Sequence, residues 1–204
     1  MSEFKTLRGM RDLLPEDAKM MIYVEDTARE VARLYGYKEI ITPVVESYEL
    51  LAAKAGNEVR SRMFAFKDLG GRDVALRPEF TASVARLIAT TLRNEPKPFR
   101  IFCMGSAYRY DEPQRGRYRE FWQSDYELIG TNRPEADAEI LMLTDRLMRD
   151  ASLEKFTMKI GHVGVLRGLL GQEEITEKEQ NEIMQLMDKR EYDDAIKLVE
   201  EAGA

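Results

Sequence analysis

The chain has 204 residues, of which 44% are hydrophobic and 33% charged, as is ordinary for a water-soluble globular protein. Its single cysteine, Cys103, and its single histidine, His162, exclude an intrachain disulfide and any metal site built from several cysteines or histidines. The apolar runs are too short to span a bilayer, and residues 1–14 lack the apolar centre of a signal peptide, so we expect a cytoplasmic protein.

The net charge of −6 is unevenly distributed along the chain. Residues 172–204 carry 11 acidic and 4 basic side chains, a net charge of −7, which leaves residues 1–171 near +1. An acidic tail of this kind is more often a solvated helix pair than a functional acidic arm. We therefore place a domain boundary at Gly171, between a large domain of residues 1–171 and the start of a helical domain at 172–204.

The first strong pattern is an amphipathic helix over residues 15–35. Pro15 suits its first turn, apolar residues recur at helical spacing, and Gly36 ends it. Residues 38–46 are β-branched and apolar, which predicts a strand, but Pro43 removes a hydrogen-bond donor from it. The strand is either an edge strand protected against aggregation or a contact to another subunit, and the pattern alone favours the former.

A strand-to-helix junction follows further along the chain. Before it we expect a short helix and the two strands of a hairpin, at residues 47–55, 63–67 and 72–76. The second strand leads into Pro78 and a helix that begins near Phe80. Glu79 and Thr81 lie at this junction, where side chains commonly face a pocket. The alternative is that they only cap the helix, which is the better local interpretation.

Residues 99–108 and 121–129 are predicted to form the two strands of a long hairpin. Aromatic residues occupy one face of the second strand, while the other face carries Gln123, Asp125 and Glu127. Polar groups on a central strand need partners or line a cavity. The alternative is a sheet face that is open to water, as in many antiparallel sheets.

The loop between these strands, residues 111–119, is rich in arginine. It carries Arg115, Arg117 and Arg119, and Arg109 precedes it on the first strand. The planar guanidinium group can bind two phosphate oxygens at once, and several such groups neutralise a polyphosphate, so we expect an ATP site here. Taken alone, an arginine-rich turn is usually a solvated loop.

Beyond the hairpin the pattern is mostly helical. We expect a helix, a strand and a short helical turn at residues 134–151, 155–160 and 162–170. Thr176 and Glu179 have capping-box spacing, which predicts a helix that runs to about Asp188. A further amphipathic helix is expected at residues 192–199.

Four segments follow one another in a specific order: LRGMRDLLP, GYKEIITPVVE, ALRPEFTASVAR and YRYDEPQRGRYREFWQSDYELIG. In these the chain resembles histidyl-tRNA synthetase, a class II aminoacyl-tRNA synthetase, and the resemblance covers residues 6–171. The second segment is similar to the family's motif 1, the third to its histidine-binding segment and the fourth to its motif 2. The resemblance implies an α+β fold with an antiparallel sheet flanked by helices, a partial helical appendage at the C-terminus, and a homodimer through residues 34–46. The edge-strand interpretation given above is thereby reversed.

The resemblance also implies roles for individual residues. Arg109 would be the catalytic arginine that holds the ATP α-phosphate, Arg117 would hold the γ-phosphate, and Phe121 would stack on adenine. Asp111 stands where the family usually has the glutamate that meets the adenine amino group, so this contact could run through water or shift to Glu112. The histidine ligand would be bound, through its ammonium and imidazole groups, by Glu79, Thr81, Gln123 and Glu127.

The implied reaction is attack of the histidine carboxylate on the α-phosphate of ATP, followed by transfer of histidine to tRNA. Cations at the α-phosphate, and Mg²⁺ on the phosphates, would neutralise the charge of the reactants. The family's second histidine-binding segment, its motif 3 and its anticodon-binding domain have no counterpart in these 204 residues. We therefore expect the chain alone to bind ATP and histidine but to be inactive or weakly active.

The alternative is a non-catalytic regulatory paralogue, like the regulatory subunit of ATP phosphoribosyltransferase. Such proteins keep the fold and tend to lose the motif 2 arginines, which this chain retains. A simple tRNA-binding module is less favoured still, because residues 1–171 have almost no net positive charge.

Overall fold

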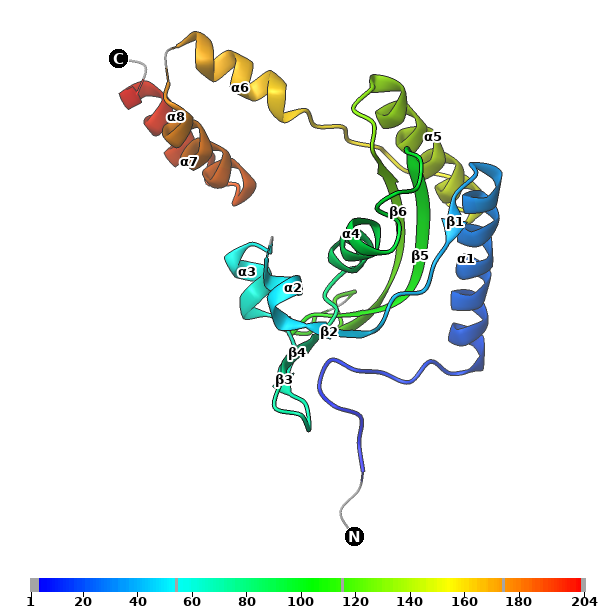
Figure 1. Ribbon diagram of the computed structural model, residues 1–204. Coiled ribbons are helices and arrows are strands. Elements are labelled where there is room, and N and C mark those ends of the chain that lie inside the picture. The colour runs from blue at the N-terminus through cyan, green and yellow to red at the C-terminus, as the bar shows by residue number, and fades with distance from the viewer. Residues whose placement is uncertain (1–3, 54, 115, 174, 203–204) are drawn as a thin grey trace. The chain divides into compact units, whose positions relative to one another are not determined.

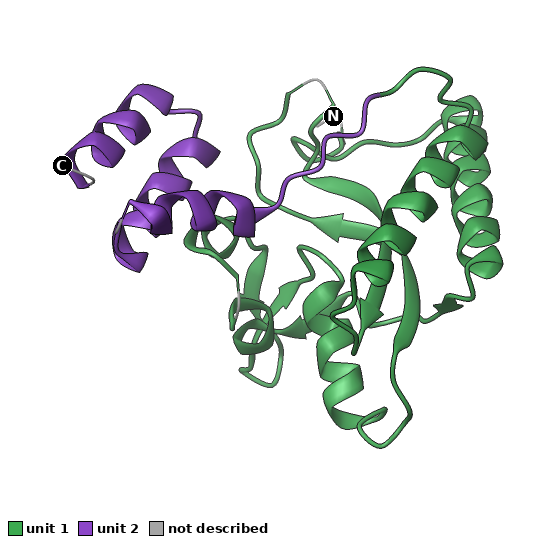
Figure 2. Ribbon diagram, turned by 90° about the horizontal axis from the view of Figure 1, so that it is seen from above, with its two compact units in different colours: residues 1–156 green, residues 157–204 purple. Residues whose placement is uncertain are grey.

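A computed structural model describes residues 4–53, 55–114, 116–173 and 175–202. The chain divides into two compact units, residues 1–156 and 157–204 (Figure 2). Helix α6 (Val163–Gln172) belongs to the second unit. The composition changes at Gly171, near the end of this helix, whereas the division between the units lies before the helix begins.

Helix α1 (Pro15–Leu34) lies where the amphipathic pattern predicts it. Pro15 occupies the first turn, where its missing N–H is not needed, and Gly36 follows the helix with a φ of +76°. The largest core cluster joins α1 to the main sheet; its buried members are Ala28, Val31, Ala32, Tyr37, Phe102 and Leu143.

The main sheet is built on the predicted hairpin of β5 (Phe99–Tyr108) and β6 (Glu120–Ile129). These strands are antiparallel, with Cys103 opposite Asp125. At the other edge of β5 lies β1 (Lys38–Glu39), which runs parallel to it. The hairpin is therefore the centre of the first unit, with the arginine-rich loop at its tip.

Helices cover both faces of this sheet, as Figure 1 shows. On one face lie α1 and α5 (Pro134–Asp150), and on the other lies α4 (Thr81–Thr90). Residues of α4 pack with Cys103, whose burial raises the pKa of its thiol to about 12, as suits a small buried apolar residue. The α+β arrangement of antiparallel strands flanked by helices is confirmed.

The prediction of one continuous strand over residues 38–46 was wrong. After β1 the Ile40 amide still donates to the carbonyl oxygen of Phe102, at 2.9 Å, but the chain then leaves the main sheet. It enters a second antiparallel sheet as β2 (Val45–Ser47). Pro43, which has no N–H to donate, lies between the two strands, so the chain changes sheets around it.

The second sheet has the order β2-β4-β3 and contains the predicted short hairpin. Its other strands are β3 (Ala65–Lys67) and β4 (Asp73–Leu76). Two short helices, α2 (Tyr48–Ala52) and α3 (Asn57–Ser61), lie between β2 and β3 in the chain. Strand β4 leads directly to the junction that carries Glu79.

The second unit is helical in its described residues. Helix α7 (Glu177–Asp188) begins with the predicted capping box, in which the Thr176 and Glu179 side chains bind each other's backbone amides. Helix α8 (Tyr192–Ala202) packs against it around Ile183. None of the helices in the described part of the chain is long and apolar enough to cross a membrane.

The strand predicted at residues 155–160 was also wrong. Their sequence is typical of a strand, but they form no β-ladder with any other described segment. A strand requires a neighbour for its backbone N–H and C=O groups, and no described strand pairs with this segment, which crosses the division between the two units.

Candidate functional site

The site begins at the junction between β4 and α4. Phe80 is the N-cap residue of α4 and no side chain caps the helix, so the interpretation of Glu79 and Thr81 as caps was wrong. Glu79 instead accepts a hydrogen bond at its Oε2 atom from Nη2 of Arg109, at 3.3 Å. Thr81 is the exposed first residue of the helix.

Arg109 extends from the end of β5 and brings three predicted site residues together. Besides Glu79, its Nε atom donates to the Pro78 carbonyl oxygen at 3.0 Å. Its guanidinium carbon lies 5.3 Å from the ring centroid of Phe121, a cation–π contact across the hairpin. The side chain is one-third exposed, so it is both held in place and open to a ligand.

Asp111 organises the first half of the loop. Its carboxylate is only 12% exposed and binds Nη1 of Arg62 at 3.0 Å and Nε of Arg117 at 3.7 Å. Arg62 follows α3 and was not anticipated, because nothing in its local sequence connects it with the hairpin. Glu112 points elsewhere and pairs with Arg8 at 2.7 Å, with both side chains largely exposed. Arg115, which the sequence also suggested, lies outside the described residues.

Arg119 differs from the other loop arginines. Its side chain is buried, its Nε atom donates to the carbonyl oxygen of Asp111 at 3.1 Å, and its guanidinium stacks 3.6 Å from the Tyr110 ring centroid. Because Arg119 is only 8% exposed, against 32% and 56% for the side chains of Arg109 and Arg117, its guanidinium is less accessible to a phosphate group than theirs. The expectation that all the loop arginines share one role therefore does not fit Arg119.

Gln123, Asp125 and Glu127 share one face of β6, as predicted. Opposite them on β5 lie Gly105, Cys103 and Ile101, and the last two pack under α4. Oε1 of Gln123 and Oδ2 of Asp125 are buried without a hydrogen-bond partner in the described residues. Both residues are half-buried on an edge strand of the main sheet, so this polar face is only partly open to water.

The electrostatics of this region are set by carboxylates. Burial, and after it the neighbouring charges of Glu127 and Glu79, together raise the pKa of Asp125 to about 6. The carboxylates of Asp125, Glu127 and Glu79 lie near one another, and this local negative charge, which Arg109 offsets only at Glu79, attracts a cationic ligand. No role was assigned to Asp125 from the sequence. The signal that could have identified it is its position between Gln123 and Glu127 in the alternating polar pattern of the strand.

Arg77, two residues before Glu79, is a buried residue with a structural role. It is 5% exposed, donates to the carbonyl oxygens of Ser106 and Thr42, both at 2.9 Å, and lies over the Phe80 ring at 4.1 Å. Burial lowers the pKa of its guanidinium. A Cβ atom on Gly105 would come within 3.0 Å of Arg77 Nη2, so glycine is required for this close approach.

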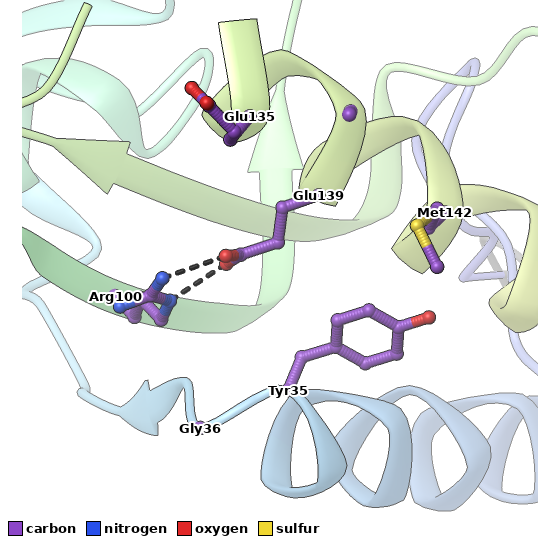
Figure 3. Close-up of a pocket in the computed structure, with 7 residues that line it drawn as sticks. Tyr35, Gly36, Arg100, Glu135, Glu139 and Met142 are labelled. Atoms are coloured by element: carbon purple, nitrogen blue, oxygen red, sulfur yellow. Dashed lines mark hydrogen bonds and ion pairs between the residues drawn. The ribbon is translucent and has the colours of Figure 1, made fainter. Parts of the chain in front are cut away.

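A separate open cavity of about 520 Å³ lies between the end of α1 and α5 (Figure 3). Of its three charged residues, Arg100 and Glu139 are bound to each other by two hydrogen bonds of 2.7 Å, while Glu135 is exposed at the start of α5. Because Arg100 and Glu139 satisfy each other, neither is free to bind a ligand. None of the predicted site residues lines it.

The comparisons with known proteins agree on one family. A family model for histidyl-tRNA synthetase matches residues 9–204. Histidine–tRNA ligase of Methanocaldococcus jannaschii is 47% identical over 190 residues, which are 93% of this chain and 45% of the relative. The ligase of Saccharolobus solfataricus is 44% identical over 201 residues, or 98% of this chain and 47% of the relative. The chain thus spans slightly less than half the length of these curated relatives.

A solved structure from Bacillus halodurans is described as an ATP phosphoribosyltransferase regulatory subunit/histidyl-tRNA synthetase. It has a TM-score of 0.84 and 32% sequence identity, and the match covers 96% of this chain and 51% of that one. Since one family model accounts for nearly every residue and the fold agrees, the chain belongs to the histidyl-tRNA synthetase family.

Proposed function

We propose that the protein is a histidine–tRNA ligase and that this chain supplies side chains for its ATP and histidine sites. The observation that carries the proposal is the convergence of Glu79, Arg109 and Phe121, from three separate places in the sequence, beside a strand face with unpartnered buried oxygens. Family membership suggests the reaction, and this convergence suggests where it takes place.

In this proposal the arginines hold the triphosphate. Two of the five N–H donors of Arg109 have acceptors among the described residues, so the others can bind the α-phosphate. Arg117 is 56% exposed and has only a long contact to Asp111, so it can reach a γ-phosphate. Phe121, already in contact with Arg109, offers its ring to adenine.

The change from the family's glutamate to Asp111 alters the adenine contact. The Asp111 carboxylate is engaged by Arg62, and we therefore assign it to the orientation of Arg117 and not to adenine. Glu112 is 78% exposed and its pairing with Arg8 lies at the surface, so it is the better acceptor for the adenine amino group.

The histidine ligand would bind at the acidic region formed by Asp125, Glu127 and Glu79. Its ammonium and imidazole groups need hydrogen-bond acceptors, and we assign this role to Glu79, Thr81, Gln123 and Glu127. Oε1 of Gln123 is a buried acceptor without a partner, which a bound N–H would satisfy. Asp125 adds negative charge behind them, which favours a cationic ligand.

The reaction would begin when a carboxylate oxygen of histidine attacks the α-phosphorus. A new P–O bond forms, the bond to the bridging oxygen breaks, and pyrophosphate leaves with the electron pair. Arg109 would stabilise the added negative charge on the α-phosphate, since a fixed cation is most effective where charge develops. Histidine would then pass from the adenylate to the 3′ end of tRNA.

Mg²⁺, when bound, would neutralise part of the phosphate charge. The described residues contain no group of three or more acidic, cysteine or histidine side chains arranged to hold a metal ion. Mg²⁺ commonly keeps several waters and binds through substrate phosphates and one or two carboxylates.

A homodimer through residues 34–46 is part of the proposal. Ile41 in this segment is 93% exposed, and Leu34 and Val45 are also exposed, so the segment offers apolar surface to a second copy. Sedimentation of the chain at several concentrations tests this, and a monomer at every concentration would contradict it.

Calorimetry tests the ATP site. We expect the chain to bind ATP–Mg²⁺, and Arg109→Ala to weaken binding by roughly tenfold or more, because it removes a charge-assisted contact. The exposed Arg93 is a matched control, and Arg93→Ala should bind as the wild type does. Folded wild-type protein that binds no ATP at millimolar concentration would overturn the proposal.

One comparison favours a second candidate function. The Bacillus halodurans structure carries the name of a regulatory subunit beside that of the synthetase. A regulatory protein would bind histidine without activating it. Histidine-dependent exchange of pyrophosphate into ATP by the whole protein separates the two, because only a synthetase gives that signal.

A further inference from the structure

The segment before α1 lies against the arginine-rich loop. The Arg119 amide donates to the Gly9 carbonyl oxygen at 2.8 Å, and the Arg119 carbonyl oxygen accepts from the Arg109 amide at 2.9 Å. Arg119 thus pairs on one side with the strand across the hairpin and on the other with residues near the start of the chain. The loop is held between them.

The Arg119 side chain packs directly against Gly9. The φ of Gly9 is +84°, a conformation that favours glycine. A Cβ atom there would lie 2.7 Å from Cγ and 2.8 Å from Cδ of Arg119, and 3.1 Å from Cγ of Pro113. Cγ and Cδ are in the middle of a side chain that is fixed at its far end, so they cannot easily move away.

The far end of Arg119 is fixed by two contacts within the loop. Its guanidinium stacks on Tyr110, and its Nε atom binds the Asp111 carbonyl oxygen. The backbone of Asp111 is thereby positioned, and the carboxylate of the same residue contacts Arg62 and Arg117. A continuous series of contacts therefore runs from Gly9 through Arg119 and Asp111 to Arg117.

Two further contacts join the same segments at the surface. The guanidinium of Arg11 lies 4.0 Å from the ring centroid of Tyr118, and Arg8 pairs with Glu112. Residues 8–11 therefore contact the loop at Glu112 and Tyr118 as well as at Arg119.

We propose that residues 8–11 are a clasp that holds the loop in its ATP-binding conformation, and that Arg119 is a positioning residue and not a phosphate ligand. The clasp acts on ATP through Asp111 and Arg117, and this part rests on the function proposed above. A loop that is already ordered loses less conformational entropy when ATP binds, so the clasp raises affinity without touching the nucleotide.

A pair of glycine substitutions tests the clasp. Gly9→Ala introduces both backbone strain and the collision with Arg119. Gly71→Ala is the matched control, since Gly71 has a φ of +77° but nothing within 4 Å of its added Cβ. We expect Gly9→Ala to weaken ATP binding roughly tenfold to a hundredfold, because small displacements of binding groups have effects of this size. Gly71→Ala should bind ATP as the wild type does.

Arg119→Met provides a second variant if Gly9→Ala fails to fold. It keeps a long apolar side chain but loses the guanidinium, so it should weaken ATP binding as Gly9→Ala does. Histidine affinity should change little in either variant, which separates loop positioning from general damage. Equal ATP affinity in wild type, Gly9→Ala and Arg119→Met would overturn the inference and leave the proposed function standing.

Hydrogen exchange gives a readout that does not require ATP. The Arg119 amide should be protected in the wild type and in Gly71→Ala, and should exchange at least about tenfold faster in Gly9→Ala. Amides in the middle of β5 and β6 should be unchanged. If the wild type binds no ATP, the proposed function fails, and this exchange pattern alone decides whether the clasp exists.

Discussion

The two faces of the β5–β6 hairpin carry carboxylates in opposite electrostatic situations. On the α5 side, Glu139 is bound by Arg100 through two hydrogen bonds of 2.7 Å, and this pairing lowers the pKa of Glu139. On the α4 side, Asp125 has no cationic partner among the described residues, and burial together with the nearby Glu127 and Glu79 raises its pKa to about 6. The first arrangement stabilises the fold, while the second maintains negative charge where a ligand is expected to bind.

One face of the β5–β6 pair therefore packs in the core, while the other face is the one to which we assign a function. Tyr126 and its neighbour Phe102 belong to the main core, and the Tyr126 hydroxyl donates to the Ala28 carbonyl oxygen at 2.9 Å. Gln123 and Asp125 on the other face leave buried oxygens unpartnered, at a cost of about 1–3 kcal/mol for each.

The largest expected effect comes from removing packing on the α1 face. Phe102 is fully buried between α1 and the sheet, so Phe102→Ala should lower the free energy of unfolding by roughly 3–5 kcal/mol. Urea denaturation measures it. The fully exposed Leu69 is the control, and Leu69→Ala should have almost no effect. A loss below about 1 kcal/mol at Phe102 would mean that this face is not the core.

Local signals in the sequence were sufficient for two of the helices and for the central hairpin. Pro15 and Gly36 delimit α1, and the Thr176 capping box begins α7, because these features act within one turn of a helix. The hairpin was predictable because its two strands are each ten residues long and nearly adjacent in the chain.

The partners of the site residues were not predictable in the same way. Arg62 reaches Asp111 from 49 residues away, and Arg77 reaches Thr42 from 35. Nothing in the local pattern distinguishes buried Arg119 from exposed Arg117, because the difference depends on Gly9, which lies far away in the sequence. The resemblance to a family proposed which residues form the site, but their partners depend on the tertiary fold.

The second prediction concerns the unpaired carboxylate. Because the pKa of Asp125 is about 6 in the folded chain and its ordinary value is 3.8, the folded state binds the proton more tightly between these values. Stability therefore falls as pH rises from about 4 to 6 and stays lower above. Asp125→Asn should remove this loss and be more stable at pH 7 by roughly 1–2 kcal/mol, after allowance for partial exposure.

Urea denaturation of both proteins from pH 4 to pH 8 measures this difference. The comparison of variant with wild type cancels the contributions of the other carboxylates. A difference that does not change with pH would show that Asp125 is not the responsible group. In histidine titrations the same variant should bind more weakly at pH 7, since it removes negative charge from the proposed site.

The third prediction has the opposite sign and lies on the other face. Glu139 has a pKa below its ordinary value of 4.5, so the unfolded state binds the proton more readily. Its contribution to stability is complete above pH 4.5 and is lost as pH falls through the folded pKa. Glu139→Gln should cost about 1 kcal/mol at pH 7, and this cost should shrink in acid. Thermal unfolding at pH 7 and pH 3.5 distinguishes this from a cost that is independent of pH.

The smallest effect is expected at the surface of the clasp, where Arg8 pairs with Glu112. Its distance of 2.7 Å equals that of the Arg100–Glu139 contact, but its side chains are 71% and 78% exposed, against 36% and 22% in the other pair. Water and salt screen an exposed pair, so a double-mutant cycle with Arg8→Ala and Glu112→Ala should give a coupling below about 0.5 kcal/mol. The cycle for Arg100 and Glu139 should give a larger value, and that ordering should persist in 0.5 M salt, because partial burial and two parallel hydrogen bonds resist screening. Equal couplings for the two pairs would mean that distance, and not burial, determines the strength of the ion pairs around this hairpin.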